Sequence, residues 1–367
     1  MSFRDVVNQQ QAKSFLKSSI AAGRVANGYL FHGPRGVGKS TMALAFAKSL
    51  NCEREDPDGC GSCTSCKKVA RFVHPDVTLI FPTSGKKEDE EIAAVLTERS
   101  GDRFYVHAFP HSASIKIGTI QALRMDLASG VREGRWRIVI LAYAEKMTPE
   151  ASNCLLRMLE EPPARVTFVL TAPSRRVLLP TIVSRCQAVR FVALAAKEIE
   201  KILVEERDAS PEEARVVAGL SGGSLSTALD LKEQDVVEYR KENLDRLKRI
   251  NAGKPAEILN VAEGLAAARD REQVRRFVRL ALLWFRDVLL VKYGAGADDV
   301  ANRDMMNELT QQAGVVELAE LRRRVNVLED IISSMERHVD LSLLLSSSFL
   351  KLSGVVEDVG QPLDTVR

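Results

Sequence analysis

Hydrophobic positions in the first half of the chain fall into two alternating patterns. Short runs of consecutive apolar residues, rich in β-branched and aromatic side chains, predict buried strands at 28–33, 76–82, 136–141, 166–172 and 188–194. Between them, apolar residues recur every three or four positions, which predicts helices at 12–25, 40–50, 117–129 and 148–163. Continuous apolar strands that alternate with helices indicate an α/β domain whose parallel sheet is covered on both faces.

Strand signals stop after about residue 195, and the remaining pattern is helical. Three short helices are predicted at 197–206, 210–220 and 224–231. Longer ones follow at 255–268, 270–294, 315–339 and 341–356, and the second and third of these are expected to exceed twenty residues. The helix around Trp284 is apolar on nearly all sides and is expected at the centre of a bundle. The predicted domains are therefore 1–195, 196–240 and 241–367.

A polar, charged segment at 84–113 is longer than a normal connection between a strand and a helix. We interpret it as a surface insertion with one helix at about 88–99. The simplest interpretation is a solvated excursion without a direct function. It contains His107 and His111, but histidines in a polar loop are usually solvated, which argues against a metal role.

Composition narrows the class of protein only moderately. The 52 basic and 49 acidic side chains leave a net charge of +3, which does not favour a nucleic-acid-binding protein. The densest late apolar run, at 280–285, is too short to span a membrane, and the N-terminus lacks the apolar core of a secretion signal. The sequence therefore predicts a globular protein of the cytoplasm without a membrane segment.

A phosphate-binding motif follows the first predicted strand. The sequence GPRGVGKS at 33–40 fits G-x-x-x-x-G-K-[ST] between a strand and a helix. Its backbone N–H groups and a lysine would hold the phosphates of ATP, and a serine would bind magnesium. A glycine-rich turn without a ligand is the alternative. The candidate nucleotide-binding residues are Gly33, Pro34, Arg35, Gly36, Val37, Gly38, Lys39, Ser40 and Thr41.

Four of the six cysteines are crowded into residues 52–66. Cys52, Cys60, Cys63 and Cys66 include two successive C-x-x-C steps in a loop of small and polar residues. Four thiolates at this spacing are typical of a closed, structural zinc site, with no position left for a catalytic water. A disulfide pair or an iron–sulfur cluster are the alternatives, and the expected reducing compartment argues against the first.

Two further segments, one after the strand at 136–141 and one around Arg185, concern phosphate chemistry. The strand at 136–141 ends in Ala142 and Tyr143, where P-loop proteins usually carry the acidic residues that hold magnesium and orient water. Neither side chain present can do this at neutral pH. Arg185, in the triplet SRC, is either a surface charge or an arginine finger, which stabilises phosphoryl charge in a neighbouring site.

These segments together resemble bacterial clamp-loader subunits of the AAA+ class. The resemblance rests on GYLFHGPRGVGKST, the four-cysteine loop, ASNCLLRMLEEPP and LLPTIVSRC, which occur in the family's order and spacing. It covers roughly residues 1–235, whereas the C-terminal bundle fits the family's collar domain by position and helicity. The resemblance implies a P-loop domain with a zinc knuckle at 52–66, a helical lid and a helical collar.

The family has two subunit types with these features, and the resemblance favours one of them. The ATP-hydrolysing motor (gamma/tau) carries an Asp-Glu pair at positions 142–143 and an arginine where this chain has Ser226. Both losses favour the non-hydrolysing stator (delta-prime) type. Glu145 would replace the acids only if the register shifted by three residues, which argues against it. A motor with an unorthodox active site and a stand-alone zinc-containing ATP-binding regulator are the alternatives.

The stator type implies a set of partners and a role for Arg185. The partners are the gamma/tau and delta subunits of a DNA polymerase III clamp loader, the sliding clamp, and primed DNA reached through the complex. Arg185 would then act in trans, in the active site of an adjacent ATPase subunit. The implied cofactors are a structural zinc ion and, less directly, ATP with magnesium.

Overall fold

The structure is a computed structural model of the 367-residue chain. It describes residues 2–85, 88–102, 104–105, 109–110, 112–233, 236–268, 270–297, 299–335 and 339–356. The chain divides into two compact units, which are described separately. The N-terminal unit comprises Met1–Ile199 with Gly223–Thr227, and the C-terminal unit comprises Glu200–Gly222 with Ala228–Arg367. The finer division at residues 195 and 240 stays a prediction.

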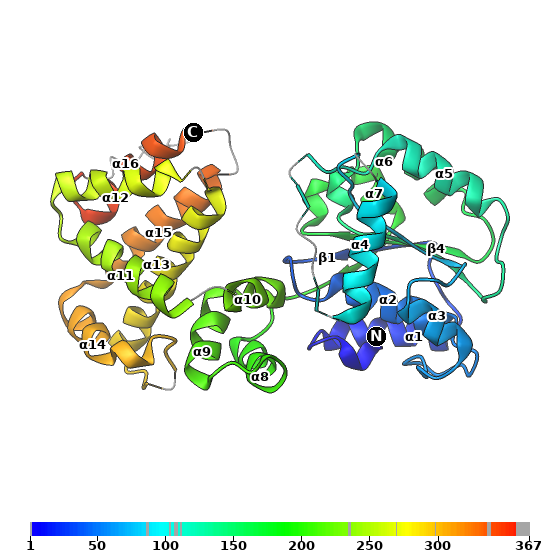
Figure 1. Ribbon diagram of the computed structural model, residues 1–367, viewed down its shortest axis with the longest axis horizontal. Coiled ribbons are helices and arrows are strands. Elements are labelled where there is room, and N and C mark those ends of the chain that lie inside the picture. The colour runs from blue at the N-terminus through cyan, green and yellow to red at the C-terminus, as the bar shows by residue number, and fades with distance from the viewer. Residues whose placement is uncertain are drawn as a thin grey trace, which may run out of the picture. The chain divides into compact units, whose positions relative to one another are not determined.

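A five-stranded parallel sheet is the centre of the N-terminal unit (Figure 1). Its strands lie in the order β2-β3-β4-β1-β5. Their bounds are β1 Gly28–His32, β2 Val77–Ile80, β3 Arg137–Leu141, β4 Val166–Ala172 and β5 Gln187–Arg190. All residues of β3 and β4 are buried, as expected for strands covered on both faces. The α/β fold with a parallel sheet is therefore confirmed.

Helices of the N-terminal unit cover the two faces of this sheet. They are η1 Phe3–Asp5, α1 Gln10–Ala21, α2 Lys39–Leu50, α3 Thr64–Ala70, α4 Glu88–Gly101, α5 Ile117–Leu127, η2 Ala144–Lys146, α6 Pro149–Glu160, η3 Arg175–Val177 and α7 Pro180–Arg185. Leu16 and Phe46, from α1 and α2, share one core with Tyr29 of β1. Leu123 and Leu155, from α5 and α6, belong to the core of the opposite face.

Capping residues explain why α6 begins and ends where it does. The Thr148 hydroxyl accepts a hydrogen bond from the Ala151 N–H, and Pro149 occupies the first turn, where no N–H is needed. The helix ends at Glu160, just before two prolines that cannot continue it. The segment LEEPP is thereby placed at a fixed helix end.

After residue 195, every regular element among the described residues is a helix. The helices are α8 Ala196–Arg207, α9 Pro211–Leu220, α10 Leu225–Lys232, α11 Val236–Asn251, α12 Pro255–Ala267, α13 Arg271–Lys292, η4 Arg303–Met305, α14 Met306–Val315, α15 Leu318–Met335 and α16 Leu341–Ser353. α13 packs against α9, α11, α12, α14 and α15, so the helix around Trp284 is central, as predicted. None of the described helices combines the length and hydrophobicity that a bilayer-spanning segment needs.

One predicted helix of the bundle is wrong in its bounds. The pattern predicted a single helix of more than twenty residues at 315–339, but Val315 ends α14 and the following helix, α15, has 18 residues. Val316 between them adopts an extended conformation. The β-branched pair Val315–Val316 disfavours a continuous helix locally, although its apolar side chains fit the helical period.

Candidate functional site

The phosphate-binding loop lies between β1 and the first residue of α2. Gly36 and Gly38 have φ values of 70° and 92°, which favour glycine. A Cβ atom on Gly33 would lie 2.2 Å from the carbonyl oxygen of Phe191, so no side chain fits there. The loop therefore has the compact, amide-lined conformation on which phosphate binding depends.

A short segment after α9 contacts the tip of this loop. The Leu225 N–H donates a hydrogen bond of 3.0 Å to the Gly36 carbonyl oxygen. The hydroxyl oxygens of Ser224 and Ser226 each lie 2.2 Å from the position of a Cβ on Gly36. Ser226, which was singled out as the replacement of a motor-type arginine, therefore lies against the loop itself.

Lys39 is the lysine of the motif, and its ammonium group is folded onto loop carbonyls. Nζ donates hydrogen bonds to the carbonyl oxygens of Gly33, at 2.7 Å, and of Pro34. Burial lowers the pKa of Lys39 to about 8, against the opposing effect of the Glu145 carboxylate. A partly buried ammonium that lacks a full countercharge is suited to receive an anion.

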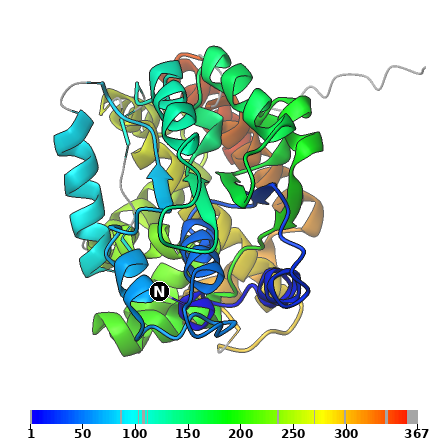
Figure 2. The same ribbon diagram turned by 90° about the vertical axis from the view of Figure 1, so that its right-hand side faces the viewer.

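The positions of the missing acids are covered by the insertion. Ala142 is 2% exposed and packs with Phe81 and with Val95 of α4. Tyr143 makes an edge-to-face contact with Phe109, with ring centroids 5.2 Å apart. The expectation of a purely solvated insertion is therefore wrong: α4 (cyan in Figure 2) docks on the end of β3 through apolar side chains.

Other parts of the insertion agree with the sequence or lie outside the described residues. The helix expected at about 88–99 is present as α4. Thr83 and Ser114 pair in an antiparallel bridge, which closes the base of the insertion. His107 and His111, for which a metal role was considered, are outside the described residues.

Glu145 is a residue of the site that the sequence argument set aside. Tyr143 adopts a left-handed conformation, with φ of 56°, and Ala144–Lys146 form one turn of 3-10 helix. This turn brings the Glu145 side chain to the P-loop, where Oε1 lies 3.4 Å from Nη2 of Arg35. In an extended chain beyond β3, Glu145 would lie three residues away from the position of the acids, but the left-handed Tyr143, which no sequence signal indicated, turns the chain back to the loop.

The four cysteines of the loop at 52–66 meet in one place. Their sulfur atoms all lie within 4.8 Å of one another, and Cys60 Sγ is 3.9 Å from Cys66 Sγ. Four ligands at about 2.3 Å around a tetrahedral zinc ion would be separated by about 3.8 Å, so the donor set fits zinc. None of the chain's cysteines is paired in a disulfide.

The environment of Cys60 favours its thiolate, whereas burial raises the pKa of Cys66. The Ser62 hydroxyl and backbone N–H groups lower the pKa of Cys60 to about 5. The backbone N–H groups of Cys60, Cys63 and Cys66 point to the sulfurs of Cys52, Cys60 and Cys63 at 3.4 Å. Such N–H···S contacts stabilise negative charge on sulfur.

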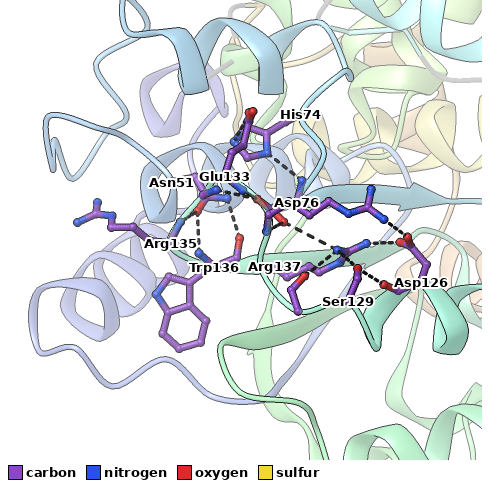
Figure 3. A network of polar contacts seen from close by, with 12 residues as sticks. Asn51, His74, Asp76, Asp126, Ser129, Glu133, Arg135, Trp136 and Arg137 are labelled. Carbon is purple, nitrogen blue, oxygen red and sulfur yellow. Dashed lines mark hydrogen bonds and ion pairs between the residues drawn. The ribbon is translucent and has the colours of Figure 1, made fainter.

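A buried polar network lies between this loop and the start of β3 (Figure 3). Asn51, adjacent to the first cysteine, accepts N–H bonds from Arg135 and Trp136 and donates one to the Trp136 carbonyl, all at 2.9 Å. His74 lies 3.1 Å from the Ser65 hydroxyl of α3. The four-cysteine loop is thereby tied to the strand that leads to Ala142.

Arg185 is the last residue of α7, just before β5. Its side chain is 36% exposed, and Nη2 lies 2.6 Å from Oε1 of Glu160, which is itself 47% exposed. Nη1 donates a 3.0 Å bond to the Thr181 carbonyl oxygen. The neighbouring Cys186 is partly buried beside Gly28, and burial raises its pKa to about 12, which makes it a packing residue.

Comparison with known proteins finds relatives among the subunits of DNA polymerase III. The family model described as DNA polymerase III, delta subunit, matches residues 8–195. The delta-prime subunit of DNA polymerase III from Bacillus subtilis is 30% identical over 315 residues, which cover 83% of this chain and 84% of the relative. The delta-prime subunit from Pseudomonas aeruginosa is 30% identical over 227 residues, 61% of each chain.

Tau subunits are also similar: that of Escherichia coli is 30% identical over 244 residues, 64% of this chain and 33% of the relative. The DNA polymerase III subunit tau of Bacillus subtilis is 25% identical over 344 residues, 87% of this chain and 56% of the relative. Extended similarity at 30% identity to delta-prime subunits, together with the matching family model, decides the family. The chain belongs to the delta-prime family of DNA polymerase III clamp-loader subunits.

Proposed function

We propose that the chain is a non-hydrolysing, stator-like subunit of the bacterial replicative clamp loader. In this role it assembles in the cytoplasm with gamma/tau and delta subunits and helps to load the sliding clamp onto primed DNA, which it reaches through the complex. The observation that carries the proposal is the apolar packing of Ala142 and Tyr143 against the insertion. Their side chains supply no carboxylate to hold magnesium or activate water.

The proposed contribution to catalysis is an arginine finger. Arg185 is exposed at a helix end, and so is its partner Glu160. Water or another charged group can therefore replace Glu160 as the partner of Arg185. A guanidinium in this setting can turn to the phosphates of an adjacent ATPase subunit. The helices within 241–367 are proposed to form the collar that holds the subunits together, with 196–240 as a lid.

Two cofactors belong to the proposal. The four cysteines at 52, 60, 63 and 66 would hold a structural zinc ion, since all four ligand positions are taken by protein. The loop residues 33–41 would hold the phosphates of a nucleotide with its magnesium ion, through the loop N–H groups, Lys39 and Ser40. The zinc ion would make the loop at 52–66 rigid. In the proposed role, this chain hydrolyses no nucleotide.

The test is the turnover of ATP by the isolated chain. We expect no phosphate release above background from the purified wild-type protein, because the end of β3 carries no acid. The Lys39→Ala variant serves as the control for contaminating ATPases and should give the same background. A wild-type turnover that disappears in Lys39→Ala would contradict the stator assignment.

That outcome would favour a second candidate function, a gamma/tau-type motor. Two observations support it as the alternative. The P-loop is complete, and the Glu145 carboxylate lies beside it at Arg35. The 25% identity to a tau subunit is consistent with either type.

A further inference from the structure

The Glu145 carboxylate lies close to the charged residues of the P-loop, although no phosphate-binding motif includes it. The 3-10 turn after Tyr143 directs its side chain to the loop, where it pairs with Arg35. Its charge also acts on Lys39, whose pKa it raises against the stronger effect of burial. The Glu145 side chain is only 11% exposed, so this interaction is weakly screened by solvent.

One of the two carboxylate oxygens lacks a partner. Oε1 faces Arg35, but Oε2 is buried and accepts no hydrogen bond from any of the residues that the structure describes. Burial raises the pKa of Glu145, whereas Arg35 and Lys39 oppose this effect. A buried carboxylate oxygen without a partner is unfavourable, and a cation or an ordered water would relieve it.

The position of this oxygen has a consequence for phosphate ligands. A metal-free di- or triphosphate in the loop would bring several negative charges close to the Glu145 carboxylate, which repels them. The same ligand with a divalent cation brings a positive charge, which the carboxylate attracts. Ala142 and Tyr143, at the end of β3, have no charge with which to make this distinction.

We infer that Glu145 is the specificity-determining carboxylate of this P-loop and makes the loop select a nucleotide that carries a divalent cation over the metal-free nucleotide. The inference rests on the P-loop as a nucleotide site and not on the clamp-loading role. It also requires no hydrolysis, since Glu145 acts on binding alone. If the chain helps to load clamps but binds no nucleotide, the proposed function stands and the inference about Glu145 fails.

Equilibrium dialysis of ADP against the full-length protein tests the inference at neutral pH, in excess magnesium chloride or in EDTA. The wild type should bind ADP at least about tenfold more tightly with magnesium. In Glu145→Gln, the affinity for metal-free ADP should rise by about tenfold and the ratio between the two conditions should fall towards one. The matched control, Glu150→Gln, removes an exposed acid in the first turn of α6 and should leave the wild-type ratio unchanged.

Two outcomes overturn the inference. One is an unchanged ratio in a Glu145→Gln protein whose melting curve matches the wild type, and the other is a wild type that binds neither form of ADP at millimolar concentration. A second measurement needs no variant: electron paramagnetic resonance with Mn²⁺ in place of magnesium reports how much metal accompanies bound ADP. About one Mn²⁺ for each bound ADP supports the inference, and ADP bound without Mn²⁺ contradicts it.

Discussion

Asp76 holds the loop at residues 132–134, which lies beside the four-cysteine loop and leads into β3 (Figure 3). It is fully buried just before β2, and its carboxylate accepts N–H bonds from Arg132, Glu133 and Gly134 at 2.8, 2.8 and 2.7 Å. Burial alone would raise the pKa of Asp76, but the three N–H groups outweigh it and hold the pKa below its ordinary value. The side chain thus fixes the loop that leads into β3.

The Asp76→Asn variant should lose this anchor. Charge-assisted hydrogen bonds of this kind contribute about 2 kcal/mol, which for a unit of this size lowers Tm by roughly 4–8 °C. Because the folded pKa is depressed, the contribution is fully present above the ordinary Asp pKa and is lost as pH falls through the folded pKa. The difference in Tm between wild type and variant, measured by calorimetry, should therefore be largest at neutral pH and shrink below about pH 4.

Asp126→Asn is the matched control for this change. Asp126 is 38% exposed and pairs with Arg137 at the edge of the same network, without the three backbone donors. Its loss should lower Tm less than the loss of Asp76. If the two variants are equally stable, the anchor at Asp76 is not the reason why this loop is fixed.

At the scale of elements, the four-cysteine loop connects the end of α2 to α3. Cys63 caps α3, since its sulfur accepts the Cys66 N–H, and Cys52 is fully buried after the end of α2. The loop between them consists mainly of polar residues and glycines, with little apolar surface of its own to bury. A metal ion is therefore expected to supply the stability that packing does not.

We expect one zinc ion per purified chain, with Zn–S distances of about 2.3 Å by X-ray absorption. Cys63→Ser should lose the zinc and lower the Tm of the N-terminal unit without changing any chemical step. Cys154→Ser, which changes an isolated thiol on α6, should keep the zinc. Elemental analysis that finds no zinc, or iron with visible absorbance, would contradict the assignment.

Most elements of the N-terminal unit were predictable because their periodicity and caps are local. β3 and α6 follow from an apolar run and from Thr148, Pro149 and the prolines after Glu160. α11 was missed because its sequence is mostly polar, and its core side chains, such as Leu244 and Leu247, are few. The docking of the insertion depends on contacts between Val95 and residues distant in sequence, which periodicity does not report.

The candidate sites were predictable to a different extent. The P-loop and the four cysteines are short motifs whose local conformation follows from residues close together in the sequence. Their side chains and backbone groups therefore come together as expected. Glu145 was not predictable, because its place depends on a positive φ at Tyr143, a conformation that the identity of a tyrosine does not indicate. Ser226 lies at the start of α10, far along the chain from the loop, and the sequence indicated the family position that it occupies but not its contact with Gly36.

At the scale of the whole molecule, Arg185 is the exposed side chain that we propose to act on a neighbouring subunit of the assembly. Arg185 ends α7 beside the end of α6, and its contacts to Glu160 and Thr181 are local to that corner. Neither contact buries the guanidinium, so an incoming phosphate can compete for it. The effect of Arg185 on a neighbouring active site can be measured only in the complete clamp loader.

In a reconstituted clamp loader, Arg185→Ala should leave assembly and zinc content intact and reduce clamp loading on primed DNA. An arginine finger contributes on the order of 10³-fold in rate to the site that it serves. Because the other sites keep their own arginines, total ATPase activity should fall only partly. Arg165→Ala, which removes an exposed arginine before β4, is the control and should load clamps normally. An Arg185→Ala complex that loads at the wild-type rate would reduce Arg185 to a surface charge.

The docking of α4 on Ala142 and Tyr143 also constrains how this protein can change over generations. A carboxylate at position 142 would be buried among the apolar side chains of Phe81 and Val95, which disfavours its charge. An evolutionary gain of an acid there would require the insertion to be lost or repacked first, because the buried charge would destabilise the fold. The apolar contact therefore makes such a substitution less accessible, and more so with every apolar residue that joins it.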